Sequence, residues 1–214
     1  MEEVDFLGSS FAKPFYGRYL KESSGVVKKI FVDKEITSLF LDIQAFTTVA
    51  VDLKASDLVA DLDKYFDLAI GIIVRNNGTI VNLVGDAIVA VFGEDQNPDH
   101  PDDACMASVE IIQEMKKFNL DRPGRPQFHL GAGINTGIAS IGVFGNSNHY
   151  QFMVVGDIVN LASRTQGLTR YYKKEILTTN FTVSRLRKNM KVKMLEKVAV
   201  KGIDESVGIY EIET

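Results

Sequence analysis

Two aspartates that close hydrophobic runs constrain this chain more than any other feature of its sequence. Asp42 directly follows the run Leu39–Leu41, and Asp86 stands between the apolar runs 79–84 and 87–92. Burial of a carboxylate at the end of a strand costs free energy, because the group loses hydration, unless a cation or a hydrogen-bond donor contacts it. Two such carboxylates, brought together by adjacent strands, form an oxygen site of the kind that holds Mg²⁺ against a phosphate chain. The pair therefore predicts a metal site.

The composition is ordinary for a soluble globular protein and compatible with a reducing compartment. With 214 residues, 45% hydrophobic and 24% charged, the chain suits one large domain with a full core. The net charge of −4 gives no general attraction to nucleic acid or to an anionic membrane. A single cysteine, Cys105, excludes an internal disulfide framework. We expect a cytoplasmic protein with no membrane span and no signal peptide, because no apolar stretch approaches about 18–20 residues.

Hydrophobic periodicity divides the chain into a lead-in, residues 1–34, and a domain, residues 35–214. The lead-in carries aromatic residues and then a basic segment, and we expect a helical or aromatic appendage that packs on the domain or on a partner subunit. Within the domain, apolar spacing predicts helices over 54–75 and from Asp99 or Pro101 to Phe118, and a third helix from about Asp157.

The remaining apolar runs of the domain predict strands. They include a hairpin over 79–84 and 87–92, and two runs, 128–135 and 139–144, joined at Thr136-Gly137. Further strands are expected near 35–42, 150–155, 176–178, 192–200 and 208–212. The order βαββαββαβ predicts an α+β fold, in which a mixed sheet carries helices on one face.

Four segments together resemble the catalytic domain of class III nucleotide cyclases, the adenylate and guanylate cyclase family. Residues 39–47, LFLDIQAFT, are similar to the family's LFADIxGFT, and residues 82–93, NLVGDAIVAVFG, to its KxIGDAxMAVFG hairpin. Residues 155–164, VGDIVNLASR, are similar to GDxVNxAxR, and residues 200–202 with 207–211 to its closing KGxxxPVxVYEV. The segments keep the family's order, so the resemblance implies a ferredoxin-like βαββαβ core and formation of a cyclic nucleotide from a nucleoside triphosphate.

The resemblance also assigns roles to residues. It implies that Asp42, Asp86 and the Ile43 carbonyl bind two Mg²⁺ or Mn²⁺ ions. The turn after Asp42 would bind the triphosphate through free backbone N–H groups, and Lys201 would reach the terminal phosphates; the turn residues are Gln44, Ala45, Phe46 and Thr47. Ala45 departs from the family's usual glycine.

Asn160 and Arg164 would act in catalysis. They lie four residues apart and so share one helix face. The resemblance implies that Asn160 orients the ribose and Arg164 meets the charge that develops on the α-phosphate. In the family these two residues and the lysine come from one subunit and the metal ligands from the other. A chain with both halves therefore implies a head-to-tail homodimer with two composite sites.

The positions that read the base leave the substrate open. Adenylate cyclases carry lysine and then aspartate or threonine there, guanylate cyclases glutamate and cysteine, but this chain has Asn82 and Met153. Asn82 can donate and accept, whereas Met153 offers bulk without a strong hydrogen bond. This resembles the bacterial pyrimidine cyclases of anti-phage signalling, which make cyclic UMP or cyclic CMP. Adenylate cyclase, guanylate or mixed specificity, and a catalytically inactive nucleotide-sensing module remain alternatives.

A palm-type polymerase or diguanylate cyclase is a weaker hypothesis, because Gly85-Asp86-Ala87 supplies one carboxylate where a GGDEF-like hairpin has an acidic pair. Zinc is not expected either. The three histidines, at positions 100, 129 and 149, lack ligand spacing, and Cys105 suits a helix core.

Overall fold

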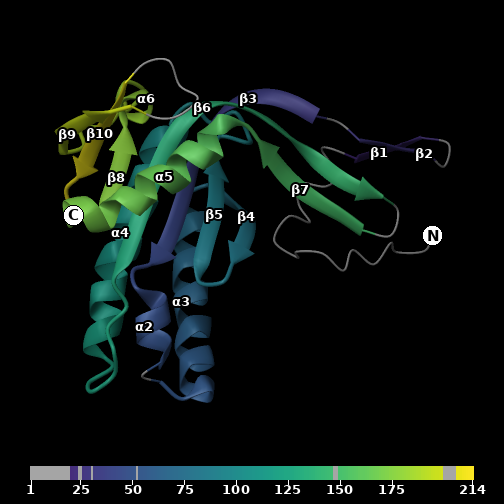
Figure 1. The fold of residues 1–214 in the computed structure, drawn as a ribbon. Coiled ribbons are helices and arrows are strands. Elements are labelled where there is room, and N and C mark those ends of the chain that lie inside the picture. The colour runs from purple at the N-terminus through teal and green to yellow at the C-terminus, as the bar shows by residue number, and fades with distance from the viewer. Residues whose placement is uncertain (1–19, 24–25, 30, 52, 147–148, 200–205) are drawn as a thin grey trace.

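A computed structural model describes residues 20–23, 26–29, 31–51, 53–146, 149–199 and 206–214. Most of its strands form one eight-stranded sheet in the order β4-β5-β3-β6-β8-β10-β9, with β7 paired to β6 (Figure 1). The strands of this sheet are β3 (Phe31–Ile43), β4 (Gly78–Val84), β5 (Ala87–Phe92), β6 (Leu130–Asn146), β7 (His149–Val155), β8 (Ile176–Thr179), β9 (Val192–Val198) and β10 (Val207–Ile212). The pair β6–β8 is parallel and the other pairs are antiparallel, so the predicted mixed sheet is confirmed.

Three long helices pack on the sheet: α3 (Ala55–Arg75), α4 (His100–Leu120) and α5 (Asp157–Tyr172). All three begin within about two residues of the predicted positions, because their apolar spacing and their flanking turns are strong local signals. Two short helices, α2 (Phe46–Val51) and α6 (Asn180–Val183), follow β3 and β8. Within the described ranges, no helix is both long and apolar enough to cross a membrane.

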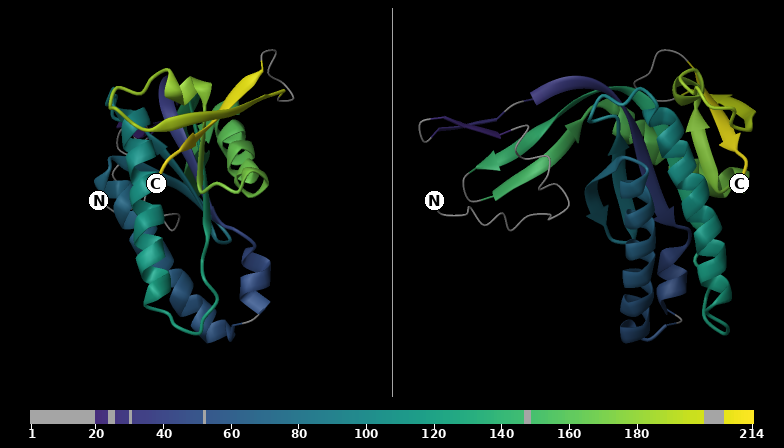
Figure 2. Two further views of the ribbon diagram at one scale, coloured as in Figure 1. Left: turned by 90° about the vertical axis from the view of Figure 1, so that its left-hand side faces the viewer. Right: turned by 180° about the vertical axis from the view of Figure 1, so that it is seen from behind.

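The helices cover both faces of the sheet, which corrects the expectation of helices on one face. Alternate residues of β3 and β6, such as Leu41 and Ile134, pack with α3 and α4 in the main core. The intervening β6 residues face α5, where Ile158 packs with Ile36 and Ile141 in a second cluster. Figure 2 (left view) shows α4 and α5 on opposite sides of the strands. Side chains of a strand alternate between faces, and the glycines of β6 leave room for α5 on the second face.

β6 is one continuous strand, whereas the sequence predicted two strands joined at Thr136-Gly137. Both residues stay in the ladder with β3, where Thr136 pairs with Thr37 and Gly137 with Ile36. Gly137 is not a turn: a Cβ there would lie 2.8 Å from Ile158, so this glycine admits the start of α5. The prediction was wrong because glycine serves close packing here.

The lead-in is extended where the structure describes it. Residues Leu20–Ser23 (β1) and Val26–Lys29 (β2) pair as an antiparallel two-stranded sheet, whereas a helix was one expectation. The aromatic residues of the predicted appendage, at 1–19, lie outside the described residues. β3, β6 and β7 project from the helical body toward this hairpin (Figures 1 and 2).

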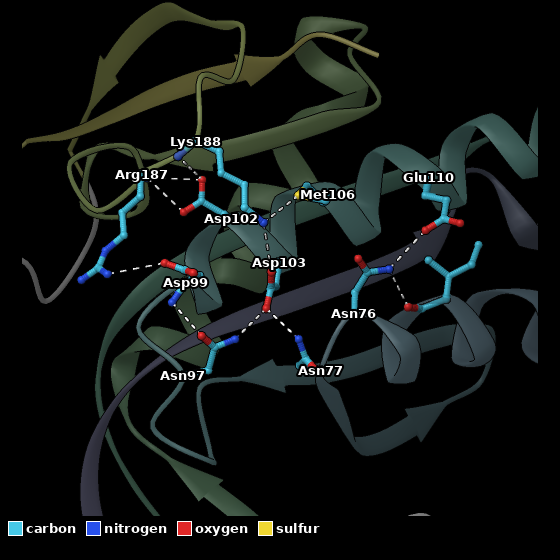
Figure 3. A network of polar contacts seen from close by, with 11 residues as sticks. Asn76, Asn77, Asn97, Asp99, Asp102, Asp103, Met106, Glu110, Arg187 and Lys188 are labelled. Atoms are coloured by element: carbon cyan, nitrogen blue, oxygen red, sulfur yellow. Dashed lines mark hydrogen bonds and ion pairs between the residues drawn. The ribbon is translucent and has the colours of Figure 1, made fainter.

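The N-terminus of α4 anchors the C-terminal part of the domain (Figure 3). The fully buried Asp102 accepts hydrogen bonds from the backbone N–H groups of Arg187 (3.0 Å) and Lys188 (2.8 Å). Its neighbour Asp103 accepts from the side chains of Asn77 (3.0 Å) and Asn97 (2.8 Å). These bonds fix the segment between α6 and β9 against the body of the domain.

Candidate active site at the end of strand β3

The structure brings Asp42 and Asp86 together. Asp42 is the second-last residue of β3, and Asp86 lies in the turn between β4 and β5. β5 pairs directly with β3, with Leu41 opposite Ile88, so the turn returns beside the end of β3. The Ile43 N–H donates a hydrogen bond of 3.1 Å to Asp86 Oδ2. The two carboxylates therefore share one corner of the sheet, as the sequence predicted.

The electrostatics of this corner favour a cation. Burial, a hydrogen bond with Asp86 and the negative charge of Asp86 raise the pKa of Asp42 to about 7; the charge of Arg170 and a hydrogen bond from Ile43 oppose this rise. A carboxyl group whose ionisation is suppressed by a second carboxylate gains most from a positive charge placed between the two. Carboxylate oxygens are also the ligands that Mg²⁺ and Mn²⁺ prefer. The donor set thus fits a divalent cation, while no group of three or more His, Cys, Asp or Glu side chains suited to a metal occurs among the described residues.

Tyr65 of α3 is a buried polar residue on which the charges of the acidic pair act. This α3 residue is fully buried, and its hydroxyl has no hydrogen-bond partner. Burial and the charges of Asp86 and Asp42 raise its pKa well above the usual value. The sequence predicted Tyr65 only as part of the apolar stripe of a helix. Helical periodicity does not show which charged residues from other parts of the chain act on a residue of that stripe.

The turn after Asp42 is held tightly by β6 and α5. The Gln44 N–H donates to the His129 carbonyl at 2.6 Å, and its side-chain amide donates to the Leu130 carbonyl (3.3 Å) and to Thr169 Oγ1 (3.2 Å). The N–H of Gln44 is therefore not free for phosphate, which corrects that part of the prediction.

Ala45 follows in the same turn with φ of 57°, in the left-handed region that costs a residue with a Cβ about 1 kcal/mol. This conformation explains why glycine is usual at the position. Phe46 and Thr47 then open α2, and the first N–H groups of a helix have no partner within it.

Asn160 and Arg164 lie on the face of α5 that points away from the sheet. The buried residues of α5, such as Ala162, Thr165 and Thr169, contact the sheet, whereas Asn160 and Arg164 are exposed. Both therefore share one helix face, as the four-residue spacing predicted.

Within one chain, Asn160 lies far from Asp42 and Asp86. Arg170 and Thr169, in the last turns of α5, approach the end of β3. Asn160 lies ten residues earlier, which corresponds to about 15 Å along a helix. Asn160 faces away from the sheet and lies far from Asp42 of the same chain, so another molecule can reach it but that Asp42 cannot.

The two candidate base-reading residues come from β4 and β7, two strands that contact each other but are not paired in the sheet. Asn82 is exposed on the edge strand β4, next to a bulge in its pairing with β5. Met153 is half-buried on β7, opposite Gly142 of β6. The adjacent residues Val81 and Val154 pack against the same apolar cluster, so both positions belong to one region of the molecule. Lys201, the candidate phosphate ligand, lies outside the described residues.

Residues 30–214 match the family model of the adenylate and guanylate cyclase catalytic domain. The chain belongs to this cyclase family. Among curated relatives of the cyclase domain, adenylate cyclase 1 of Rhizobium meliloti is 30% identical over 182 residues, and adenylate cyclase of Anabaena cylindrica is 33% identical over 189 residues. Each alignment covers 84% of this chain but only 27% and 37% of these relatives, so the chain spans well under half of their length.

Solved cyclase structures share the fold. The adenylyl cyclase CyaB from P. aeruginosa superposes with a TM-score of 0.76 at 27% identity, over 86% of this chain and 96% of that one. The guanylyl cyclase Cya2 superposes with a TM-score of 0.77 at 27% identity, over 85% of this chain and 92% of that one. The class III cyclase fold expected from the four sequence segments is therefore confirmed.

Two residues linked electrostatically to the acidic pair of this cyclase domain were missed by the sequence analysis. Arg170 lies six residues after Arg164 and outside the segment that resembles the family, and its proximity to Asp42 arises only when α5 packs across β3. Tyr65 has no local motif at all. Both depend on contacts between elements far apart in the chain, which no spacing rule encodes.

Proposed function

We propose that this domain is a nucleotidyl cyclase, which converts a nucleoside triphosphate to a 3′,5′-cyclic nucleotide and pyrophosphate at a site shared by two copies of the chain. The observation that carries the proposal is the paired Asp42 and Asp86 at one end of the sheet, with Asn160 and Arg164 exposed on the far side of α5. A head-to-tail pair of chains would place each acidic corner against the exposed α5 face of the other chain. Membership of the cyclase family and the names of the relatives support this reading.

Asp42, Asp86 and the Ile43 carbonyl would hold the divalent cations, Mg²⁺ or Mn²⁺. When bound there, such ions would supply acidification of the 3′-hydroxyl and neutralisation of charge on the triphosphate. The chain's own part is to fix the two carboxylates: the Ile43 N–H holds Asp86 in place at 3.1 Å. Gln44, anchored to β6 and α5, sets the start of the turn, and Phe46 and Thr47 present the N–H groups of the first turn of α2 to phosphate oxygens.

The second copy would supply the groups that act on the reacting phosphate. Its Asn160 orients the ribose through a side-chain amide that can both donate and accept. Its Arg164 offers a permanent charge and a planar set of donors to the α-phosphate, where negative charge grows in the transition state. Lys201 is the candidate for the terminal phosphates.

For the base, we propose a pyrimidine preference, with UTP or CTP converted to cyclic UMP or cyclic CMP, as in anti-phage signalling. Asn82 can pair with several bases, and Met153 fills space without offering a strong hydrogen bond. A site selects a purine through hydrogen bonds to the polar edge of the base. A site without fixed partners for those groups therefore has no preference for a purine. Conversion of ATP to cyclic AMP is the second candidate, favoured by the adenylate cyclase names of the curated relatives.

The test is a comparison of all four nucleoside triphosphates with the purified chain and Mn²⁺, with products separated by mass spectrometry. We expect a cyclic pyrimidine nucleotide as the fastest product, and no product from Asp42→Ala. A strong preference for ATP would overturn the pyrimidine assignment and leave the cyclase intact. If the wild-type chain forms no cyclic nucleotide yet binds nucleoside triphosphates, the domain is a sensing module.

A further inference from the structure

Arg170 is a cationic side chain beside the acidic corner to which the proposed chemistry gives no role. It lies exposed in the last turn of α5, and among the described residues its guanidinium makes no hydrogen bond or ion pair. A triphosphate held on two carboxylates keeps a net negative charge even when two divalent cations are bound. A further cation supplied by the chain would therefore stabilise the bound phosphates.

The packing of α5 on β6 places the last turn of the helix level with Asp42. Asp42 is paired with Gly131 in the ladder between β3 and β6. A Cβ on Gly131 would lie 2.5 Å from Thr169 Oγ1, so Thr169 lies directly over this pair. The side chain of Gln44, in the turn after Asp42, also donates to Thr169 Oγ1 at 3.2 Å. Arg170 is the next residue, and it is therefore held at the level of the acidic corner.

Helical spacing places Arg170 on the β3 side of α5. Leu161 packs with residues of β8 and β10 on one side of the helix, whereas Val159 packs on the opposite side with Ile36 of β3. Arg170 follows Val159 by about three helical turns and so lies on the same side. Ile36 and Asp42 are an even number of residues apart and therefore share the face of β3 that α5 covers. Burial and the neighbouring carboxylate raise the pKa of Asp42, and the charge of Arg170 opposes this rise, in agreement with the placement.

We propose that Arg170 binds the terminal phosphates of the triphosphate at the acidic corner of its own chain. This inference rests on the proposed function of Asp42 and Asp86 as ligands of the cations that hold a triphosphate. A guanidinium stays charged and can offer two parallel N–H donors to one phosphate group. Arg170 thus binds the phosphates that leave as pyrophosphate, whereas Arg164 of the second copy acts on the α-phosphate.

The experiment measures binding of inorganic pyrophosphate to the full chain in the presence of Mn²⁺ by isothermal titration calorimetry, so that no turnover is needed. We expect Arg170→Gln to raise the Kd for pyrophosphate about 10-fold, because hydrogen bonds between two charged groups are lost. Arg170→Lys keeps the charge without the paired donors and should raise the Kd by less. A purely structural arginine predicts a lower Tm and an unchanged Kd for Arg170→Gln, and an unchanged Kd would overturn the inference.

Two further variants make the result specific. Arg187→Gln removes the same charge from an exposed side chain whose Nη1 lies 3.5 Å from Asp99 Oδ1, beside the N-terminus of α4, and it should leave the Kd unchanged. An equal rise for Arg187→Gln and Arg170→Gln would show a general effect of net charge and would overturn the inference.

Asp42→Ala should abolish the binding of pyrophosphate that depends on Mn²⁺. If it does so while Arg170→Gln binds like wild type, the role of Arg170 fails and the acidic corner stands. If wild type binds no pyrophosphate with Mn²⁺, the corner and the role of Arg170 fail together. If binding depends on Arg170 but no triphosphate is cyclised, the inference stands and the proposed reaction fails.

Discussion

At the scale of single residues, the acidic pair shows how a fold can hold two like charges side by side. Asp42 and Asp86 are kept close by the pairing of β3 with β5 and by the Ile43 N–H, not by attraction for each other. The cost appears in Asp42, whose pKa rises from 3.8 to about 7 through burial and the neighbouring carboxylate. A site built in this way is poised to take up a cation and to release a proton as it does so.

This raised pKa makes the stability of the cation-free chain depend on pH. The folded-state pKa of Asp42 exceeds its usual value, so the contribution of this group is fully present below about pH 4 and is lost as pH rises through about 7. The cation binds the ionised form of Asp42. We therefore expect the rise in Tm caused by Mn²⁺ to grow between about pH 5.5 and pH 7.5, a range that brackets a pKa near 7. Thermal unfolding at each pH, with and without Mn²⁺, measures this gain.

Asp42→Asn serves as the control for that pH series. The amide cannot ionise, so the variant should show no Mn²⁺-dependent gain at any pH in the series. A gain in wild type that stays constant across the range would contradict the assignment of the proton to Asp42.

At the scale of elements, the contact of β6 with α5 depends on the absence of side chains. A Cβ on Gly133 would lie 2.2 Å from the Ala162 carbonyl oxygen and 2.2 Å from the Gln166 backbone nitrogen. Both atoms belong to the helix backbone, so the neighbour cannot give way by rotating a side chain. This close approach sets the height of α5 above the sheet, and with it the placement of Asn160 and Arg164.

We predict that Gly133→Ala destabilises the domain by about 3 kcal/mol, because α5 must move away from β6 to admit the methyl group. Chemical denaturation followed by circular dichroism measures the change in the free energy of unfolding. The matched control is Gly167→Ala, since a Cβ at this α5 position meets nothing within 4 Å. It should be neutral or stabilising by up to about 1 kcal/mol, as alanine favours a helix over glycine. Equal effects of the two substitutions would contradict this account of the packing.

At the scale of the whole molecule, the proposed site is divided between the two ends of a single domain. The acidic corner lies at the end of β3, whereas Asn160 lies about 15 Å away along α5, on the face turned from the sheet. Two chains in head-to-tail contact would complete two equivalent sites, and one chain alone would complete none.

The division predicts complementation between two inactive variants. Asp42→Ala and Arg164→Ala should each abolish cyclic nucleotide formation as homodimers, since each removes one half of every site. Mixed in equal amounts and allowed to exchange subunits, they should recover about a quarter of the wild-type rate, because half of the dimers are mixed and each mixed dimer holds one intact site. Product formation in the mixture measures this. A mixture that remains inactive despite exchange, shown by differently tagged chains, would contradict the shared site.

The sequence predicted most of the individual elements and failed where packing decides. The α3 helix, the β4–β5 hairpin and the start of α5 follow from local patterns, and all three are confirmed. The sequence predicted a junction between two strands at Thr136-Gly137, but here the glycine admits Ile158 of α5. The second helical face of the sheet was missed for the same reason, because the sequence does not show which side of a strand a distant helix will cover.

Local residue patterns and spacing along the chain were sufficient to predict the family of the domain, its order of elements and the paired carboxylates. The packing of the folded chain was needed to show that helices cover both faces of the sheet, that the Gln44 N–H already donates to the His129 carbonyl, and that the charges of the acidic pair act on Tyr65 while that of Arg170 acts on Asp42. These outcomes depend on contacts between residues distant in the chain. The packing of glycines against α5 and the burial of α3 fix those contacts, and neither leaves a periodic signal in the sequence.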